Sequence, residues 1–191
     1  QILAARDGVE GMGMISRFPL HETGERLDGD SWVGAPQVLE ADIYGLSVTL
    51  VNAHAIPVLG DTDSMTWAVG ERERQAATIA AFAAAHRGPL LVAGDMNATP
   101  FHQTYPLFTR SLVDAWNSAG DGMGFTWPGG DRGQSSVEIG GIPLPAWLFR
   151  IDYLFHSRDL TAINATVGPW DGGSDHRPVI ATFAPKPDND R

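Results

Sequence analysis

Cysteine is absent from the 191 residues, and lysine occurs once, at Lys186. The lack of cysteine excludes disulfides, thiolate metal sites and cysteine nucleophiles, and it leaves the cellular compartment open. Thirteen Lys and Arg residues stand against 23 Asp and Glu residues, which gives a net charge of −10 without any run of basic residues. A protein that holds DNA through its phosphates presents clustered cations. Tight binding of a nucleic acid is therefore disfavoured, whereas a metal-bearing site would still accept a compact phosphate ester.

Long apolar runs are also missing, so no stretch has the length needed to cross a bilayer. The chain begins with Gln1 rather than Met, and we expect it to be part of a longer protein whose signal or anchor lies elsewhere. With 43% apolar and 19% charged residues, the composition predicts one domain over residues 1–184, large enough to bury a core. Residues 185–191 read as a flexible tail. The oligomeric state stays open.

Short apolar segments with strand-like alternation dominate the chain. The predicted strands cover residues 1–5, 11–16, 37–42, 46–52, 90–93, 150–155, 161–167 and 179–183. The clearest helix spans residues 65–86, where Ala76, Ile79 and Ala83 follow helical spacing and Arg72 and Arg74 are expected on a solvated face. A short helix is expected at 101–109, and loops at 21–31 and 120–147.

Four predicted strand ends carry side chains that bind metals or move protons. These pairs are Asn52/His54, Asp95/Asn97, Arg150/Asp152 and Asp175/His176. Because strand ends are where side chains from distant parts of a chain converge, we predict that they form one site. The structural alternatives are a capped turn at Asp95 and Asn97, a partnered strand charge at Asp152 beside Arg150, and a core histidine at His54. The remaining histidines have no motif context and are assigned to the surface or to packing: His21, His86, His102 and His156.

Several of these segments match a known family in the correct order. Gly94-Asp95-Met96-Asn97, Arg150-Ile151-Asp152-Tyr153 and Ser174-Asp175-His176-Arg177-Pro178 resemble motifs of the endonuclease/exonuclease/phosphatase superfamily, which includes deoxyribonuclease I. Val51-Asn52-Ala53-His54 and Ile15-Ser16-Arg17-Phe18-Pro19 are similar to two further strand ends of that superfamily. The Gly-Asp-x-Asn signal alone is weak, the five-residue motif ending in Pro178 is strong, and their common order makes the set specific.

The resemblance implies a fold and a chemistry. The implied fold is an α/β (α+β) four-layer sandwich of two mixed β-sheets flanked by helices, which suits a strand-rich pattern with few helices. The implied reaction is hydrolysis of phosphate esters that depends on a divalent metal, usually Mg²⁺. The oxygen ligands of this cysteine-free chain suit Mg²⁺, Mn²⁺ or Ca²⁺. The expected partner is therefore a phosphate-ester substrate.

Matched position by position, the resemblance assigns roles to the strand-end residues. His176 would activate water, with Asp152 fixing its tautomer and supporting its charge. Asp95 would position the attacking water or bind the metal, and Asp175 would be a metal ligand.

The remaining matched residues would act on the substrate's oxygens or support the site. Asn97 and His54 would donate to the oxygens where negative charge builds up. Asn52 would help to order the site, and Arg150 would be a further supporting residue.

One departure concerns the start of the chain. The family's principal metal-binding Glu and an accompanying Asn lie on strands that would precede Gln1, and Glu10, which sits in a turn, is a poor substitute. We therefore expect the N-terminal strands to be missing here and this chain alone to be inactive or nearly so. Thr126-Trp127-Pro128 ahead of Arg150 most resembles bacterial members with an N-terminal membrane anchor, which implies a domain outside the cytoplasm.

The sequence thus predicts a metal-dependent phosphoesterase. The acidic composition and the Trp-bearing segment 120–147 favour a small or lipid-linked phosphate over DNA. A metal-dependent nuclease and a non-catalytic scaffold that keeps the fold are the alternatives.

Overall fold

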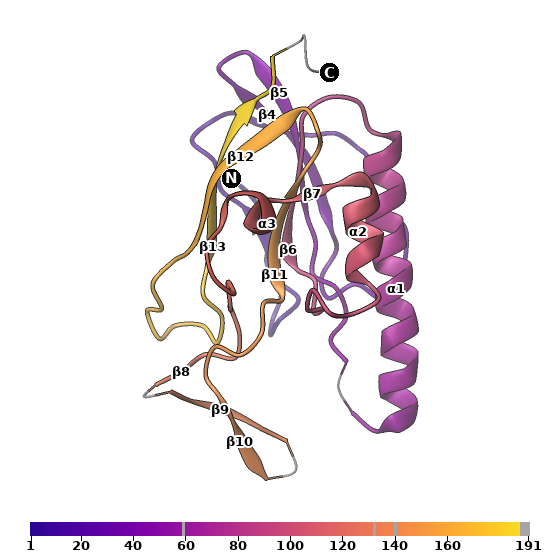
Figure 1. The fold of residues 1–191 in the computed structure, drawn as a ribbon. Helices are drawn as coiled ribbons and strands as arrows, with labels where there is room; N and C mark the ends of the chain where they lie inside the picture. Colours follow the sequence, from indigo (N-terminus) through magenta and orange to yellow (C-terminus); the bar gives the residue numbers. More distant parts are fainter. Residues whose placement is uncertain (59, 132, 140, 188–191) are drawn as a thin grey trace.

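A mixed six-stranded sheet forms the centre of the molecule in the computed structural model, which describes residues 1–58, 60–131, 133–139 and 141–187 (Figure 1). Its strand order is β3-β4-β5-β6-β11-β7. In chain order these strands are β3 (Leu20–Glu22), β4 (Gln37–Ile43), β5 (Leu46–Asn52), β6 (Leu90–Asp95), β7 (Val113–Asp114) and β11 (Asp152–His156). Strands β5 and β6 are parallel, whereas β11 runs antiparallel to β6. The C-terminal ends of β5 and β6 and the N-terminal end of β11 therefore lie at the same end of the sheet.

Helix α1 (Thr62–Ala85) and helix α2 (Tyr105–Ser111) pack together on one side of this sheet (Figure 1). Asp61 caps α1 by accepting a hydrogen bond from the Ser64 backbone N–H at 2.9 Å. Apolar side chains of both helices and of the central strands form the core, including Ala76, Ile79, Leu90, Val92, Phe108 and Phe155. This packing holds α1 against β5 and β6, close to the C-terminal ends of these two strands.

The remaining strands form smaller sheets. Strands β12 (Leu160–Val167) and β13 (Val179–Pro185) pair antiparallel and lie on the side of the central sheet opposite α1 (Figure 1). Strands β1 (Ile2–Ala4) and β2 (Met12–Met14) form a second antiparallel pair. A third sheet projects from the body and consists of β8 (Gly130–Asp131), β9 (Gln134–Ile139) and β10 (Ile142–Pro145) (Figure 1). The short helix α3 (Ala115–Ala119) packs on β12. This strand-rich α+β architecture confirms the predicted fold class.

Most predicted elements are present, and the differences have local causes. The predicted loop at 21–31 begins within the edge strand β3, which is too short for alternation to reveal. The predicted loop at 120–147 contains β8, β9 and β10, where Pro143 and Pro145 weaken the strand signal. The helix expected at 101–109 begins only at Tyr105.

The C-terminal strand extends the fold further along the chain than the sequence predicted. Strand β13 reaches Pro185, and the Lys186 backbone N–H donates to Asp159 O at 2.8 Å, so the predicted tail starts with ordered contacts. Residues 188–191 of that tail lie outside the described part of the chain. Among the described residues, no helix has both the length and the apolar character required to cross a membrane.

Candidate active site

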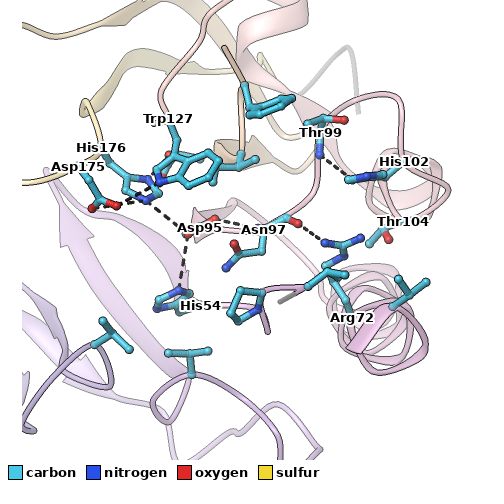
Figure 2. A pocket seen from close by; sticks show the side chains of 18 of the residues that line it. His54, Arg72, Asp95, Asn97, Thr99, His102, Thr104, Trp127, Asp175 and His176 are labelled. Atoms are coloured by element: carbon cyan, nitrogen blue, oxygen red, sulfur yellow. Dashed lines mark hydrogen bonds and ion pairs between the residues drawn. The ribbon is translucent and has the colours of Figure 1, made fainter. Parts of the chain in front are cut away.

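Side chains from three strand ends and one loop meet at a cavity of about 1210 Å³. His54 follows β5, Asp95 ends β6, and Asp152 begins β11. The loop before β13 adds Asp175 and His176 (Figure 2). Asn97 also lines the cavity, so all six residues that were given a catalytic or metal-binding role share it: His54, Asp95, Asn97, Asp152, Asp175 and His176.

A hydrogen bond joins the two residues predicted to move the proton. His176 Nδ1 lies 2.8 Å from Asp152 Oδ2, a distance at which the ring N–H donates to the carboxylate. The other ring nitrogen, Nε2, lies 4.0 Å from Asp95 Oδ2 and 3.9 Å from Asp175 Oδ1. With Nδ1 carrying the proton, Nε2 is free to accept one at the centre of the cavity.

The sheet register places two acids opposite each other. Asp95 and Asp152 are direct partners in the antiparallel pairing of β6 and β11. Burial, followed by the charge of Asp152, raises the pKa of Asp95 to about 7. Like charges in facing strand positions destabilise a sheet, so this arrangement is unfavourable for the fold alone. It is typical of a site that holds a cation or moves protons.

The two histidines of the cavity shift in opposite directions. Burial lowers the pKa of His54, and the neighbouring His176 lowers it further. Burial also disfavours the charged form of His176, but the hydrogen bond and charge of Asp152 outweigh it and raise the pKa of His176. His54 therefore stays neutral near pH 7, whereas His176 holds a proton more readily than an ordinary histidine.

The same cluster offers ligands for a metal ion. One ligand atom from each of Asp95, Asp152 and His176 lies within 4.8 Å of the others. Two facing carboxylates beside a neutral His54 leave negative charge that a divalent cation would offset, and carboxylate oxygens suit Mg²⁺, Mn²⁺ or Ca²⁺. The residues present thus fit a metal of this kind.

The first half of the site consists of His54, Asp95 and Asn97 and continues the parallel ladder of β5 and β6. Beyond the strands, the Ala55 backbone N–H still donates to Asp95 O at 2.9 Å. Asn97 adopts a left-handed conformation with φ 47, in which its backbone N–H donates to Asp95 Oδ1 at 2.7 Å and its side chain to Ala55 O at 2.8 Å. At Gly94, φ is 144 and an added Cβ would lie 1.8 Å from Ala53 O, so this close approach requires glycine.

The second half of the site consists of Asp152, Asp175 and His176, and a loop holds it. Thr126 Oγ1 accepts hydrogen bonds from the backbone N–H groups of residues 151 and 152 at 3.3 Å and 3.4 Å. Trp127 Nε1 donates to Asp175 Oδ2 at 3.1 Å, and its ring lies beside that of His176 (Figure 2). Segment 126–127 therefore contacts all three residues of this half, the backbone of Asp152 through Thr126 and the side chains of Asp175 and His176 through Trp127.

Two predicted supporting residues lie outside the cavity lining. Asn52 Nδ2 donates to Gly13 O at 3.3 Å and to Gln37 Oε1 at 3.2 Å, so it ties β5 to β2 and β4. Arg150 is 4% exposed and forms a buried ion pair with Asp114, with 2.7 Å between NH1 and Oδ2. Both residues hold the strands behind the site and do not face its centre.

Sequence reasoning missed residues that line or support the cavity. Arg72, expected on a solvated face, is 4% exposed and lines the cavity, so that expectation was wrong. The spacing of Arg72, Gln75, Ala76 and Ile79 places all four on one helical face, and this was the available signal. His102, assigned to surface or packing, also lines the cavity, and its Nδ1 accepts from the Thr99 backbone N–H at 3.0 Å.

The sequence matches the model of the Endonuclease/Exonuclease/phosphatase family over residues 2–176. The chain therefore belongs to this family, as the motifs predicted. No curated protein matches the chain in sequence.

Solved structures with the same fold include members of this family and proteins of other description. A 3′ phosphatase from Neisseria bound to a product DNA hairpin is 19% identical, with a TM-score of 0.58 over 88% of this chain and 73% of its own. The human Nocturnin catalytic domain with bound sulfate is 19% identical, with a TM-score of 0.54 over 90% of this chain and 59% of its own.

A functionally unknown protein from Enterococcus faecalis is 18% identical, with a TM-score of 0.57 over 79% of this chain and 55% of its own. At these identities the likeness concerns the fold. The chain spans 53–55% of the length of this structure and of two Bacteroides family members.

Proposed function

We propose that this domain hydrolyses a phosphate ester with the help of a divalent metal, and that His176 activates the attacking water. The observation that carries the proposal is the 2.8 Å hydrogen bond from His176 Nδ1 to Asp152, which leaves Nε2 facing the cavity. A histidine held in this tautomer by a carboxylate is a general base whose charged form is stabilised as it forms.

The proposed step is a displacement at phosphorus. Water loses a proton to His176 Nε2 while its oxygen bonds to phosphorus, and the bond from phosphorus to the ester oxygen breaks. The departing oxygen takes up a proton from solvent and leaves as an alcohol, and the imidazolium afterwards returns its proton to solvent. The imidazolium that forms lies 2.8 Å from Asp152 and near Asp95, so its positive charge is stabilised throughout.

Asn97 and neutral His54 are proposed to bind the phosphate's non-bridging oxygens. One N–H of the Asn97 amide donates to Ala55 O, which fixes the group and leaves the second N–H for a ligand in the cavity. His54 Nε2 lies 3.6 Å from Asp95 Oδ2, on the opposite side of that carboxylate from His176 (Figure 2). Donors fixed in advance stabilise the charge that develops on such oxygens.

Asp95 and Asp175 are proposed to hold the metal, because Asp152 is engaged by His176. A divalent cation bound there would supply positive charge to the phosphate oxygens. The chain spans 53–55% of the length of three similar structures, so the natural protein in full is the proper material for experiments. Magnesium remains the expected ion, with manganese and calcium as alternatives.

The lining of the cavity supports a small or lipid-linked ester. Apolar side chains form much of the lining, among them Val33, Val58, Val69, Trp127 and Phe149. Arg72 is the one Arg or Lys among the described residues that line it. A nucleic-acid backbone needs a succession of cations, so the nuclease alternative has less support.

The test is turnover of the full-length natural protein on bis(p-nitrophenyl) phosphate while Mg²⁺, Mn²⁺ or Ca²⁺ is titrated. We expect metal-dependent release of nitrophenol that His176→Ala and Asp95→Ala abolish. His21→Ala, which changes an exposed histidine far from the cavity lining, serves as the matched control. A DNA hairpin and a lipid phosphate diester assayed in parallel separate the candidate substrates.

Absence of metal-dependent turnover on every substrate, with the two variants indistinguishable from the parent, would support the non-catalytic scaffold instead. Faster hydrolysis of DNA, with an affinity that falls as salt rises, would move the assignment to a nuclease.

A further inference from the structure

Two buried polar side chains of α1 reach the strand ends that carry the first half of the site. Arg72 Nη1 donates to Asn97 O (Figure 2). Gln75 Oε1 accepts from the Ile56 backbone N–H at 2.9 Å. The two side chains are one helical turn apart and only 4% and 2% exposed. We name this pair, Arg72 and Gln75, the α1 clamp.

The α1 clamp holds both of the backbone segments that follow the parallel strands. Ile56 comes two residues after His54, and Asn97 comes two residues after Asp95. The bond from Asn97 Nδ2 to Ala55 O at 2.8 Å joins the two segments to each other. Asn97 has φ 47, a left-handed conformation that persists only where its surroundings fix it. Arg72 is one of the groups that fix it, because it binds the carbonyl of that residue.

The guanidinium of Arg72 is poorly placed for stability alone. No described carboxylate lies within 4.0 Å of it, and its Nε is buried without a hydrogen-bond partner among the described residues. Burial of a charge without a carboxylate partner costs free energy, and apolar residues often stabilise a core better in its place. Arg74, two residues further on, is exposed and instead forms an ion pair with Glu71. A role in the site explains why the buried position carries the cation.

We infer that Arg72, together with Gln75, is a positioning residue that holds the Asn97 amide and the Asp95 carboxylate at the reacting phosphate. This inference rests on the proposed function, because it names what the clamp is for. The α1 clamp contacts backbone and not the cavity centre, so its loss displaces groups that act on the transition state. Such a loss lowers kcat more than it changes KM.

The experiment compares Arg72→Met, Arg72→Lys and Gln75→Met in the full-length natural protein. Arg87→Met is the matched control, since it removes an exposed cation beyond the other end of the same helix. Three quantities are measured: kcat and KM on bis(p-nitrophenyl) phosphate, the thermal midpoint of unfolding, and hydrogen–deuterium exchange of the segment 94–99.

We expect Arg72→Met to lower kcat by roughly 10- to 100-fold, the usual effect of losing a group that orients a site. Its KM and the position of its pH profile should stay near those of the parent. Its unfolding midpoint should be unchanged or higher, because an incompletely paired buried charge is gone. Segment 94–99 should exchange faster. Arg72→Lys, which keeps a donor, should recover part of kcat, and Arg87→Met should match the parent throughout.

The inference is overturned if Arg72→Met keeps the parent's kcat and exchange, or if its midpoint falls while kcat stays the same. Should Arg72→Met fail to fold, Gln75→Met tests the second contact of the clamp; failure of both to fold would make the pair structural. If the parent itself has no activity, the proposed function fails, and faster exchange at 94–99 in Arg72→Met still decides whether the clamp exists.

Discussion

The two halves of the site are held by different means. His54, Asp95 and Asn97 continue a parallel backbone ladder, and buried side chains of α1 hold that ladder from behind. Asp152 starts a strand and its backbone N–H donates to the Thr126 hydroxyl, whereas Asp175 and His176 lie on a loop that the Trp127 indole contacts. Backbone hydrogen bonds in the core resist local opening more than contacts of exposed loops do. We therefore expect the first half to be the more rigid one, and the loop that carries Asp175 and His176 to adjust more readily to a substrate.

The chemistry should depend most on the second half. His176→Ala removes the proposed base, and we expect kcat to fall about 10³-fold, within the range of general base catalysis. His54→Ala removes a proposed donor from the first half and should cost less, roughly 10²-fold. Steady-state assays with the metal in excess measure both. Equal losses, or a larger loss for His54→Ala, would contradict this division of roles.

The fold should depend most on the first half. Gly94→Ala would place a Cβ 1.8 Å from Ala53 O at φ 144, and the clash is with backbone atoms rather than with a flexible side chain. We expect a loss of about 3 kcal/mol in the free energy of unfolding, at the upper end of ordinary single substitutions. Urea denaturation measures it.

Gly88→Ala is the matched control, because Gly88 has φ 94 but nothing within 4 Å of an added Cβ. It isolates the cost of the left-handed backbone, which is roughly 1 kcal/mol. If the two variants lost equal stability, the close approach of β5 and β6 at Gly94 would have no special role.

A smaller effect is expected where the loop meets the second half. Thr126→Val removes the hydroxyl that accepts from two backbone N–H groups, one of them that of Asp152. Thr126 is fully buried, so those groups lose their partner, and we expect a cost of about 1 kcal/mol together with a fall in kcat. Thr126→Ser keeps the hydroxyl and should restore both quantities. Normal kcat in Thr126→Val would show that Asp152 needs no support from this loop.

The same contrast explains what could be predicted from the sequence. Alternating apolar residues predicted β4, β5, β11 and β12. The strand-end rule identified the residues that share the cavity, but it also included Asn52 and Arg150, which lie outside the lining. Contacts that depend on one buried polar atom, such as Arg72 to Asn97 O or Thr126 to the Asp152 backbone, follow no periodic pattern. They arise from the angle at which a helix or a loop packs on the sheet, and that angle is a property of the tertiary fold. The hairpin of β9 and β10 was missed because glycine and proline obscure its alternation.

We expect the smallest effect on activity from a substitution at His156, which is 3% exposed and lies at the end of β11 opposite the site. Its Nδ1 lies 2.8 Å from Ser157 O, and its Nε2 is buried without a partner among the described residues. Burial lowers the pKa of His156, and the charge of Lys186 opposes the contributions of Ser157 and Asp114 that raise it. The unfolded chain then binds the proton more readily than the folded one, so this histidine's contribution is intact above pH 6.5, the ordinary histidine pKa. As the pH falls below 6.5 towards the lower pKa of the folded state, stability is lost.

Urea denaturation of His156→Phe between pH 5 and pH 8, about the range over which histidines titrate, should show a weaker pH dependence than the parent, with kcat at pH 8 unchanged. A fall in that kcat would mean that the far end of β11 communicates with Asp152, and the separation between scaffold and site would have to be redrawn along this strand.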